Sequence, residues 1–78
     1  MQTGPFSEYA TAAAVTPSDT TAVSFRGVWV GGAGNLAVVT EGGNTVTFTG
    51  VIAGTLLPVA VKAVNSTNTT ATNIVGLA

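Results

Sequence analysis

The stretch GVWVGGAGNLAVVT, from Gly27 to Thr40, contains two short apolar segments joined by a glycine-rich one. Valine, aromatic and other β-favouring residues separated by glycine-rich turns are typical of all-β domains. We therefore predict a strand on each side of Gly31–Asn35. Because glycine and asparagine tolerate the backbone angles of tight turns, we interpret Gly31–Asn35 as a hairpin turn between these strands.

The same stretch contains a Gly-x-Gly-x-x-Ala pattern at Gly32, Gly34 and Ala37, which also occurs in dinucleotide-binding loops. In those loops the third small residue opens a helix, whose N-terminus binds the pyrophosphate. Here Ala37 lies within the apolar segment Leu36–Thr40, and the chain has no room for the βαβ unit of about 30 residues. The pattern therefore predicts a turn, and we expect no cofactor.

The composition favours association with other proteins. The chain has 78 residues and only five charged side chains, or 6% of the total, with a net charge of −1. Soluble domains average about a quarter charged residues, and surfaces with little net charge tend to associate. Two cations are too few for binding to nucleic acid through phosphates. Because cysteine and histidine are absent, disulfides and the common zinc sites are excluded.

Candidate catalytic groups are equally sparse. The acids Glu8, Asp19 and Glu41 are scattered along the chain, and no histidine is present to activate a serine or threonine. Lys62 alone is a weak candidate for a general base. We therefore expect no enzymatic activity, no catalytic residues and no metal site.

We interpret residues 1–21 as an N-terminal arm and residues 22–78 as a β domain. Pro5 and Pro17 restrict the residues before them to extended backbone, and Ala10–Ala14 is long enough only for a marginal helix. A disordered tail is the alternative for the arm. In the first interpretation the arm contacts a neighbouring subunit or its own domain through three apolar side chains: Phe6, Tyr9 and Val15.

Alternation within Ala22–Val30 divides the first predicted strand into two faces. We assign Val23, Phe25 and Trp29 to the core and the remaining side chains, Arg26, Val28 and Val30, to the other face. An exposed Trp29 would instead indicate an interface or a platform for stacking sugars.

Further strands are predicted along the rest of the chain. Thr45–Gly50 alternates, with Val46 and Phe48 directed inward. The other predicted strands are 36–40, 56–64 and 72–78. The predicted connections are a hairpin turn at 41–44, a turn around Gly54 and a polar loop at 65–71. About five short strands indicate a small antiparallel β-sandwich or barrel.

The two cations lie in two different predicted strands. Arg26 and Lys62 are placed to pair with Glu41 or an acid of the arm, within a subunit or across a seam between subunits; the alternative is that both are solvated surface charges. The longest apolar stretch, Val51–Val61, is too short to cross a bilayer and contains a proline, so we expect no membrane partner.

Three segments together resemble the head-spike base proteins of gene transfer agents and related tailed phages. They are FRGVWVGGAGNLAVV (25–39), VTFTGVIAGTLLPVAVKAV (46–64) and TTATNIVGL (69–77), and TPSD (16–19) fits the same pattern. The resemblance covers Val15 to Leu77. The family pattern often has several cations after Leu-Pro-Val, whereas Lys62 is the single cation there in this chain.

The resemblance implies a structural virion protein on the outer capsid surface, made in the host cytoplasm. It implies an oligomeric base for a head spike or fibre, or a subunit that decorates or cements the capsid. The implied partners are copies of itself, the major capsid protein and a spike or fibre protein. We expect the arm and seam residues Phe6, Tyr9, Val15, Arg26 and Lys62 to make these contacts. The alternative function is a carbohydrate-binding adhesin or fibre module.

Overall fold

The computed structural model describes residues 9–78, which form an antiparallel β-sandwich measuring 38 × 25 × 19 Å. This confirms the predicted all-β fold class, with seven strands where about five were expected. Phe6, one of the predicted arm contacts, lies outside the described residues. Within residues 9–78, no helix of a length and apolarity suited to crossing a membrane is present. The strands are β1 (Ala12–Val15), β2 (Gly27–Gly32), β3 (Gly34–Thr40), β4 (Thr45–Val51), β5 (Thr55–Leu57), β6 (Val61–Val64) and β7 (Thr72–Leu77).

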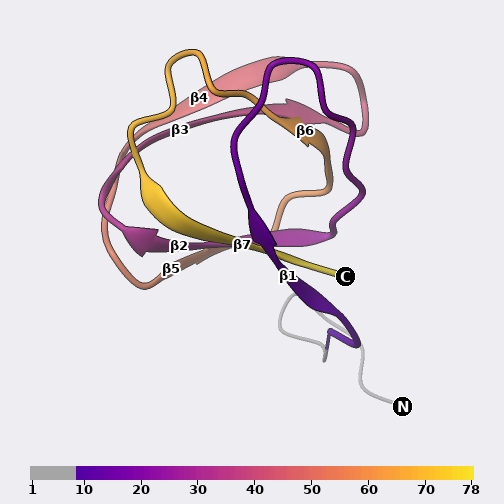
Figure 1. Cartoon of the computed structure of the whole chain (residues 1–78), viewed down its shortest axis with the longest axis horizontal. Helices are drawn as coiled ribbons and strands as arrows, with labels where there is room; N and C mark the ends of the chain where they lie inside the picture. The colour runs from indigo at the N-terminus through magenta and orange to yellow at the C-terminus, as the bar shows by residue number, and fades with distance from the viewer. Residues whose placement is uncertain (1–8) are drawn as a thin grey trace.

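The strands form two sheets that face each other (Figure 1). The first has four strands in the order β1-β7-β2-β5, and the second has three in the order β4-β3-β6. Every pairing between neighbouring strands is antiparallel. In Figure 1 the four-stranded sheet is the lower layer and the three-stranded sheet is the upper one.

The predicted hairpin at Gly31–Asn35 is wrong, because the chain crosses from one sheet to the other there. β2 pairs with β5 and β7, whereas β3 pairs with β4 and β6. At this corner the backbone packs tightly against residues 70–71. A Cβ on Gly34 would lie 2.6 Å from the backbone nitrogen of Ala71, so glycine is needed for close approach.

The second predicted turn is a true hairpin. Glu41–Asn44 connects β3 to β4, whose register places Val39 opposite Thr45. The backbone N–H of Thr40 donates to the carbonyl of Asn44 at 2.8 Å, and that of Gly43 donates to the carbonyl of Thr40 at 2.9 Å. Gly43 has a φ of +92°, which side chains disfavour.

The single strand predicted over residues 56–64 is also wrong. The segment contains β5, in the four-stranded sheet, and β6, in the three-stranded sheet, so the chain changes sheets within it. The break begins at Pro58, which has no N–H to donate to a ladder. Strict alternation along the sequence concealed this break, because Leu57 and Val61 each contact the core from a different sheet.

Part of the predicted arm belongs to the sandwich. The region Ala10–Ala14 contains no helix; Ala12–Val15 forms β1, which pairs with β7. The chain then passes to the other sheet and covers the outer edge of β6. There the N–H groups of Ser18 and Val23 donate to the carbonyls of Val64 and Lys62, both at 2.9 Å.

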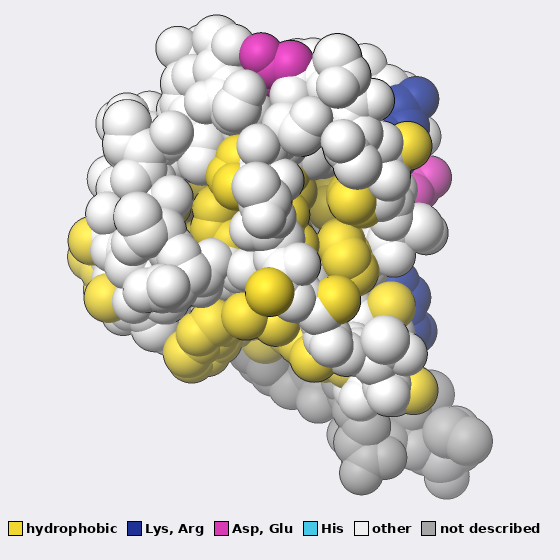
Figure 2. Space-filling model, viewed as in Figure 1, with side chains coloured by type: hydrophobic (Ala, Val, Ile, Leu, Met, Phe, Trp, Pro, Cys, Tyr) yellow, Lys and Arg dark blue, Asp and Glu magenta, His cyan; other side chains and the backbone are white. Residues whose placement is uncertain are grey.

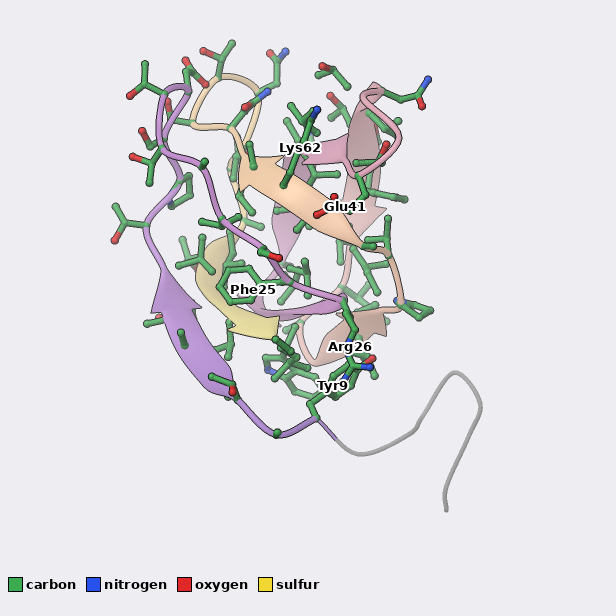
Figure 3. All side chains as sticks on the ribbon, turned by 90° about the vertical axis from the view of Figure 1, so that its right-hand side faces the viewer. Tyr9, Phe25, Arg26, Glu41 and Lys62 are labelled. Atoms are coloured by element: carbon green, nitrogen blue, oxygen red, sulfur yellow. The ribbon has the colours of Figure 1, made fainter. Side chains whose placement is uncertain are left out.

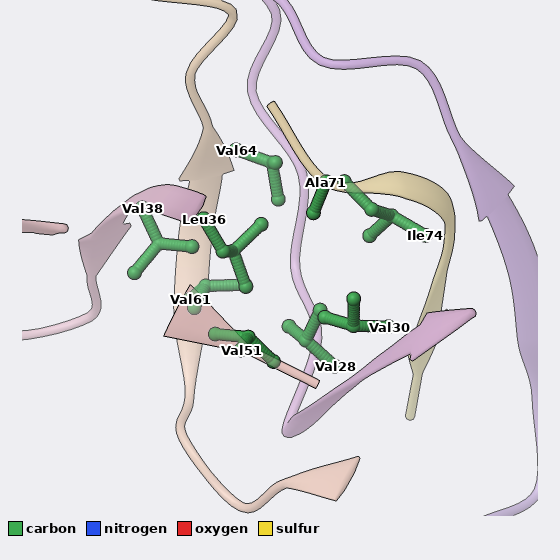
Figure 4. Packing of buried hydrophobic residues seen from close by; sticks show 9 residues of the cluster. All are labelled: Val28, Val30, Leu36, Val38, Val51, Val61, Val64, Ala71 and Ile74. Carbon is green, nitrogen blue, oxygen red and sulfur yellow. The ribbon is translucent and has the colours of Figure 1, made fainter. Parts of the chain in front are cut away.

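Valines dominate the core between the sheets (Figure 4). Burying each such side chain contributes roughly 1.5–3 kcal/mol. Val46 was also expected inside, but it is 39% exposed, because β4 is the last strand of its sheet. The largest fully buried side chains are Val28, Val30, Leu36, Val38 and Val61.

Trp29 is not a core residue, which corrects the prediction for this strand. Val28 and Val30 are fully buried, so Trp29 between them points outward and is 41% exposed. The alternation from Val23 to Val30 is interrupted by a bend at Arg26, and β2 begins only at Gly27. Phe25, before the bend, still packs against the core, whereas Trp29, after it, does not.

Candidate docking surface

Four apolar side chains form a row across the outer face of the four-stranded sheet. Trp29 lies directly opposite Leu56 on one side and Val75 on the other, and Val75 lies opposite Ala14. Residues opposite one another in a sheet point to the same face. Since Trp29 points outward, these four residues, one from each strand, share the outer face. We call them the Trp29 row.

Tyr9 and Arg26 lie beside the Trp29 row. A Cβ on Gly27 would lie 2.8 Å from the Tyr9 hydroxyl, so Tyr9 covers the position where a Gly27 side chain would stand. Gly27 is two residues from Trp29 and shares its face. The Arg26 guanidinium carbon lies 5.6 Å from the centre of the Tyr9 ring, a cation–π distance (Figure 3). The row therefore adjoins an aromatic ring and one positive charge.

Exposed apolar side chains occur on the side of the molecule that carries the Trp29 row. Figure 2 shows hydrophobic side chains gathered along the lower side of the molecule, the side of the four-stranded sheet. Contiguous exposed apolar surface marks sites of association with other molecules.

The structure brings together two of the five predicted contact residues, Tyr9 and Arg26. Val15 lies opposite Ile74 and packs against the protein's own core. Lys62 is exposed on β6, in the other sheet, and Figure 3 shows it on the same side as Glu41, away from Arg26.

Asp19 has a structural role. Its carboxylate accepts hydrogen bonds from the N–H groups of Ser66 and Thr67, at 2.9 and 3.0 Å, and from the Thr67 hydroxyl at 2.5 Å. The Thr67 side chain and then its backbone are the main cause of a lowered pKa of Asp19. Asp19 thus connects the segment that covers β6 to the loop before β7. In residues 9–78, no three acidic, cysteine or histidine side chains come close enough to hold a metal ion.

Sequence reasoning missed Trp29 as a surface residue, although a signal was present. Gly27 and Gly31 share the face of Trp29, whereas the alternate positions Val28 and Val30 supply two adjacent β-branched side chains. A face that contains glycine at two of three positions offers little apolar area to a core. The valine face is therefore the one that the second sheet covers.

A solved structure resembles the chain over almost its whole length. It is a chain from the capsid of a native gene transfer agent particle, computed with C5 symmetry. The two are 37% identical, with a TM-score of 0.84, and the match covers 99% of this chain and 92% of the other. This chain belongs to that gene transfer agent capsid family. No family model and no curated protein matches the sequence.

Membership in the gene transfer agent capsid family agrees with the part of the predicted resemblance that names a virion structural protein. The two-sheet sandwich is thus the architecture of a capsid component.

Proposed function

We propose that this protein is a structural component of the virion, bound to the outer surface of the capsid. There it forms an oligomeric base for a head spike or fibre, or decorates the capsid. The observation that carries this proposal is the exposed Trp29 row on a chain of a capsid family. Its partners are copies of itself, the major capsid protein and a spike or fibre protein, and it is made in the host cytoplasm.

The Trp29 row is the surface that contacts the capsid. Its side chains are apolar and lie on a continuous sheet, so docking removes apolar area from water at about 25 cal/mol per Å². A buried tryptophan near the centre of an interface is a common determinant of affinity. Tyr9 and Arg26 adjoin the row and contact the same partner, together with Phe6. Docking also supplies stability that a 78-residue chain is short of.

The experiment mixes the purified protein with capsids assembled without it and measures co-sedimentation. Trp29→Ala is expected to weaken binding at least about tenfold, since tryptophan hot spots contribute 2 kcal/mol or more. Ile52→Ala is the matched control, because Ile52 is also exposed and apolar but lies outside the row. Capsids that bind no wild-type protein, or that bind Trp29→Ala as well as wild type, would contradict the proposal.

A carbohydrate-binding adhesin is the second candidate, and the exposure of Trp29 is the observation that favours it. Sugar sites combine a stacking ring with several polar side chains. The residues opposite Trp29 are Leu56 and Val75, which provide none, so we prefer protein docking. Glycan binding that is lost in a folded Trp29→Ala variant would reverse this preference.

A further inference from the structure

The outer edge of β4 is a surface that the proposed function does not use. β4 is the last strand of the three-stranded sheet, and within residues 9–78 only β3 pairs with it. Hydrogen-bonded and non-bonded pairs alternate along an antiparallel ladder. The Thr40 N–H donates to the Asn44 carbonyl, so Val46 and Phe48 make the next ladder bonds to β3. The N–H and C=O groups of Thr45 and Thr47 therefore point to the outer edge.

This edge lacks the usual protection against pairing. Edge strands are commonly short, interrupted by proline, charged or covered. β6 is covered by the segment that precedes β2, and β5 has three residues followed by Pro58. β4 has seven residues with neither a charge nor a proline. Its only irregularity is a bulge near Gly50, beyond the regular part of the strand.

We propose that β4 pairs in antiparallel orientation with β4 of a second copy of this chain, with Thr47 opposite Thr47. This register is self-complementary. Thr45 then lies opposite Thr49, so that threonine hydroxyls face each other on one side of the new sheet. Val46 lies opposite Phe48 on the other side, which covers a valine that is 39% exposed in the single chain. Threonine pairs and pairs of aromatic and β-branched residues both stabilise neighbouring strands.

Charge also favours a second copy as the partner. The strand itself is uncharged, and the nearest acid, Glu41, precedes it by four residues. In the antiparallel register the two copies of Glu41 lie at opposite ends of the paired strands and do not repel each other. A charged strand of another protein would find no opposite charge on β4 to pair with.

The pairing joins two three-stranded sheets into one of six strands around a two-fold axis. Such an interface uses the same surface of both copies and closes after two. The Trp29 row lies on the other sheet and stays accessible in the dimer. The inference therefore goes beyond the proposed function and holds whether or not the protein docks on a capsid.

Analytical ultracentrifugation of the purified protein over a range of concentrations provides the first test. We expect a reversible dimer, and Thr47→Lys is expected to weaken it at least about tenfold, because it places two like charges opposite each other. Ala22→Lys is the matched control: it adds the same charge at an exposed site on the segment that covers β6. Wild type that stays monomeric at all concentrations, or an unaffected dimer of Thr47→Lys, would overturn the proposal.

Amide hydrogen exchange of the wild type provides a second test that requires no variant. Dimer formation is expected to slow the Thr45 and Thr47 amides several-fold, whereas Val46 and Phe48, already bonded to β3, change little. Oligomers in which Thr45 and Thr47 exchange as fast as in the dilute protein would contradict the pairing. A pentamer with protected β4 amides would also overturn it, because another strand would then occupy the edge.

Discussion

The two faces of the four-stranded sheet use the same strands for different purposes. On the inner face Val28 and Val30 of β2 are fully buried, and Ile74 of β7 is 3% exposed. On the outer face Trp29, between the two valines, is 41% exposed, and Val75 beside it is half-buried. Residues adjacent in sequence therefore differ in whether the chain itself covers them. The inner face supplies stability, and the outer face is available for association.

This difference follows from the size of the chain. The three-stranded sheet covers one face of the four-stranded sheet, and within residues 9–78 no further strand lies over the other face. Most domains would place charged side chains on such a face, but this chain has only five in total. We propose that a partner covers the Trp29 row, whose Trp29 is 41% exposed in the single chain.

Two neighbouring substitutions in β7 test most strongly whether the inner and outer faces of the four-stranded sheet differ in their contribution to stability. Ile74→Ala is expected to lower the free energy of unfolding by about 2–5 kcal/mol, because it leaves a cavity in the core. Val75→Ala, on the outer face, is expected to cost less than about 1 kcal/mol. Urea denaturation followed by tryptophan fluorescence measures both. Equal losses would show that the outer face also stabilises the single chain.

Gly76→Ala tests how closely the inner face is packed. A Cβ there would overlap the ring of Phe25, which lies over the glycine. Because the ring is held against the core, we expect a loss of about 1–3 kcal/mol, as for other overpacked sites. The same unfolding experiment checks this.

A double-mutant cycle with Phe25→Ala supplies the control for Gly76→Ala. Removing the ring abolishes the overlap, so Gly76→Ala should then cost at least about 0.5 kcal/mol less. If the two substitutions lowered the free energy of unfolding independently, the strain caused by Gly76→Ala would lie elsewhere in β7.

Asp19 shows what a polar contact at the rim contributes in comparison with the inner face. Its pKa is lowered in the folded protein from 3.8, so its stabilising effect is present above that value and is lost as the pH falls through the folded pKa. Asp19→Asn is therefore expected to be less stable than wild type at neutral pH, and the difference should shrink in acid. Melting temperatures of both proteins, measured from neutral pH down into acid, give this difference in stability. A difference that is constant with pH would assign the effect to something other than the carboxylate charge.

The local parts of the fold were predictable from sequence, and the long-range parts were not. The hairpin at Glu41–Asn44 and the closing strand near Ile74 follow from turn residues and alternation over a few positions. Gly31–Asn35 has the same turn chemistry, yet it joins different sheets. Which strands pair is decided by contacts with distant residues, such as Ala71 against Gly34, and a short segment does not encode them.

The candidate site was predictable only in part for a related reason. Tyr9 and Arg26 were predicted to contact a partner; the structure places them together, and their contact with a partner stays a prediction. Trp29 was assigned to the core, because the bend at Arg26 changes the phase of alternation without an obvious sign in the sequence. The division of the chain at residue 21 stays a prediction, although β1 is part of the sandwich.

The smallest expected effect is that of salt on docking. If the Trp29 row supplies the affinity, co-sedimentation with capsids should change less than about threefold between about 0.05 and about 0.5 M NaCl, because salt screens charges and leaves apolar contacts in place. A fall of tenfold or more would instead assign the affinity to charge, and Arg26, beside the row, would be the first residue to examine. In that case Arg26→Gln should remove the dependence on salt. If it does not, another of the five charged side chains supplies the affinity, and the Trp29 row is not its source.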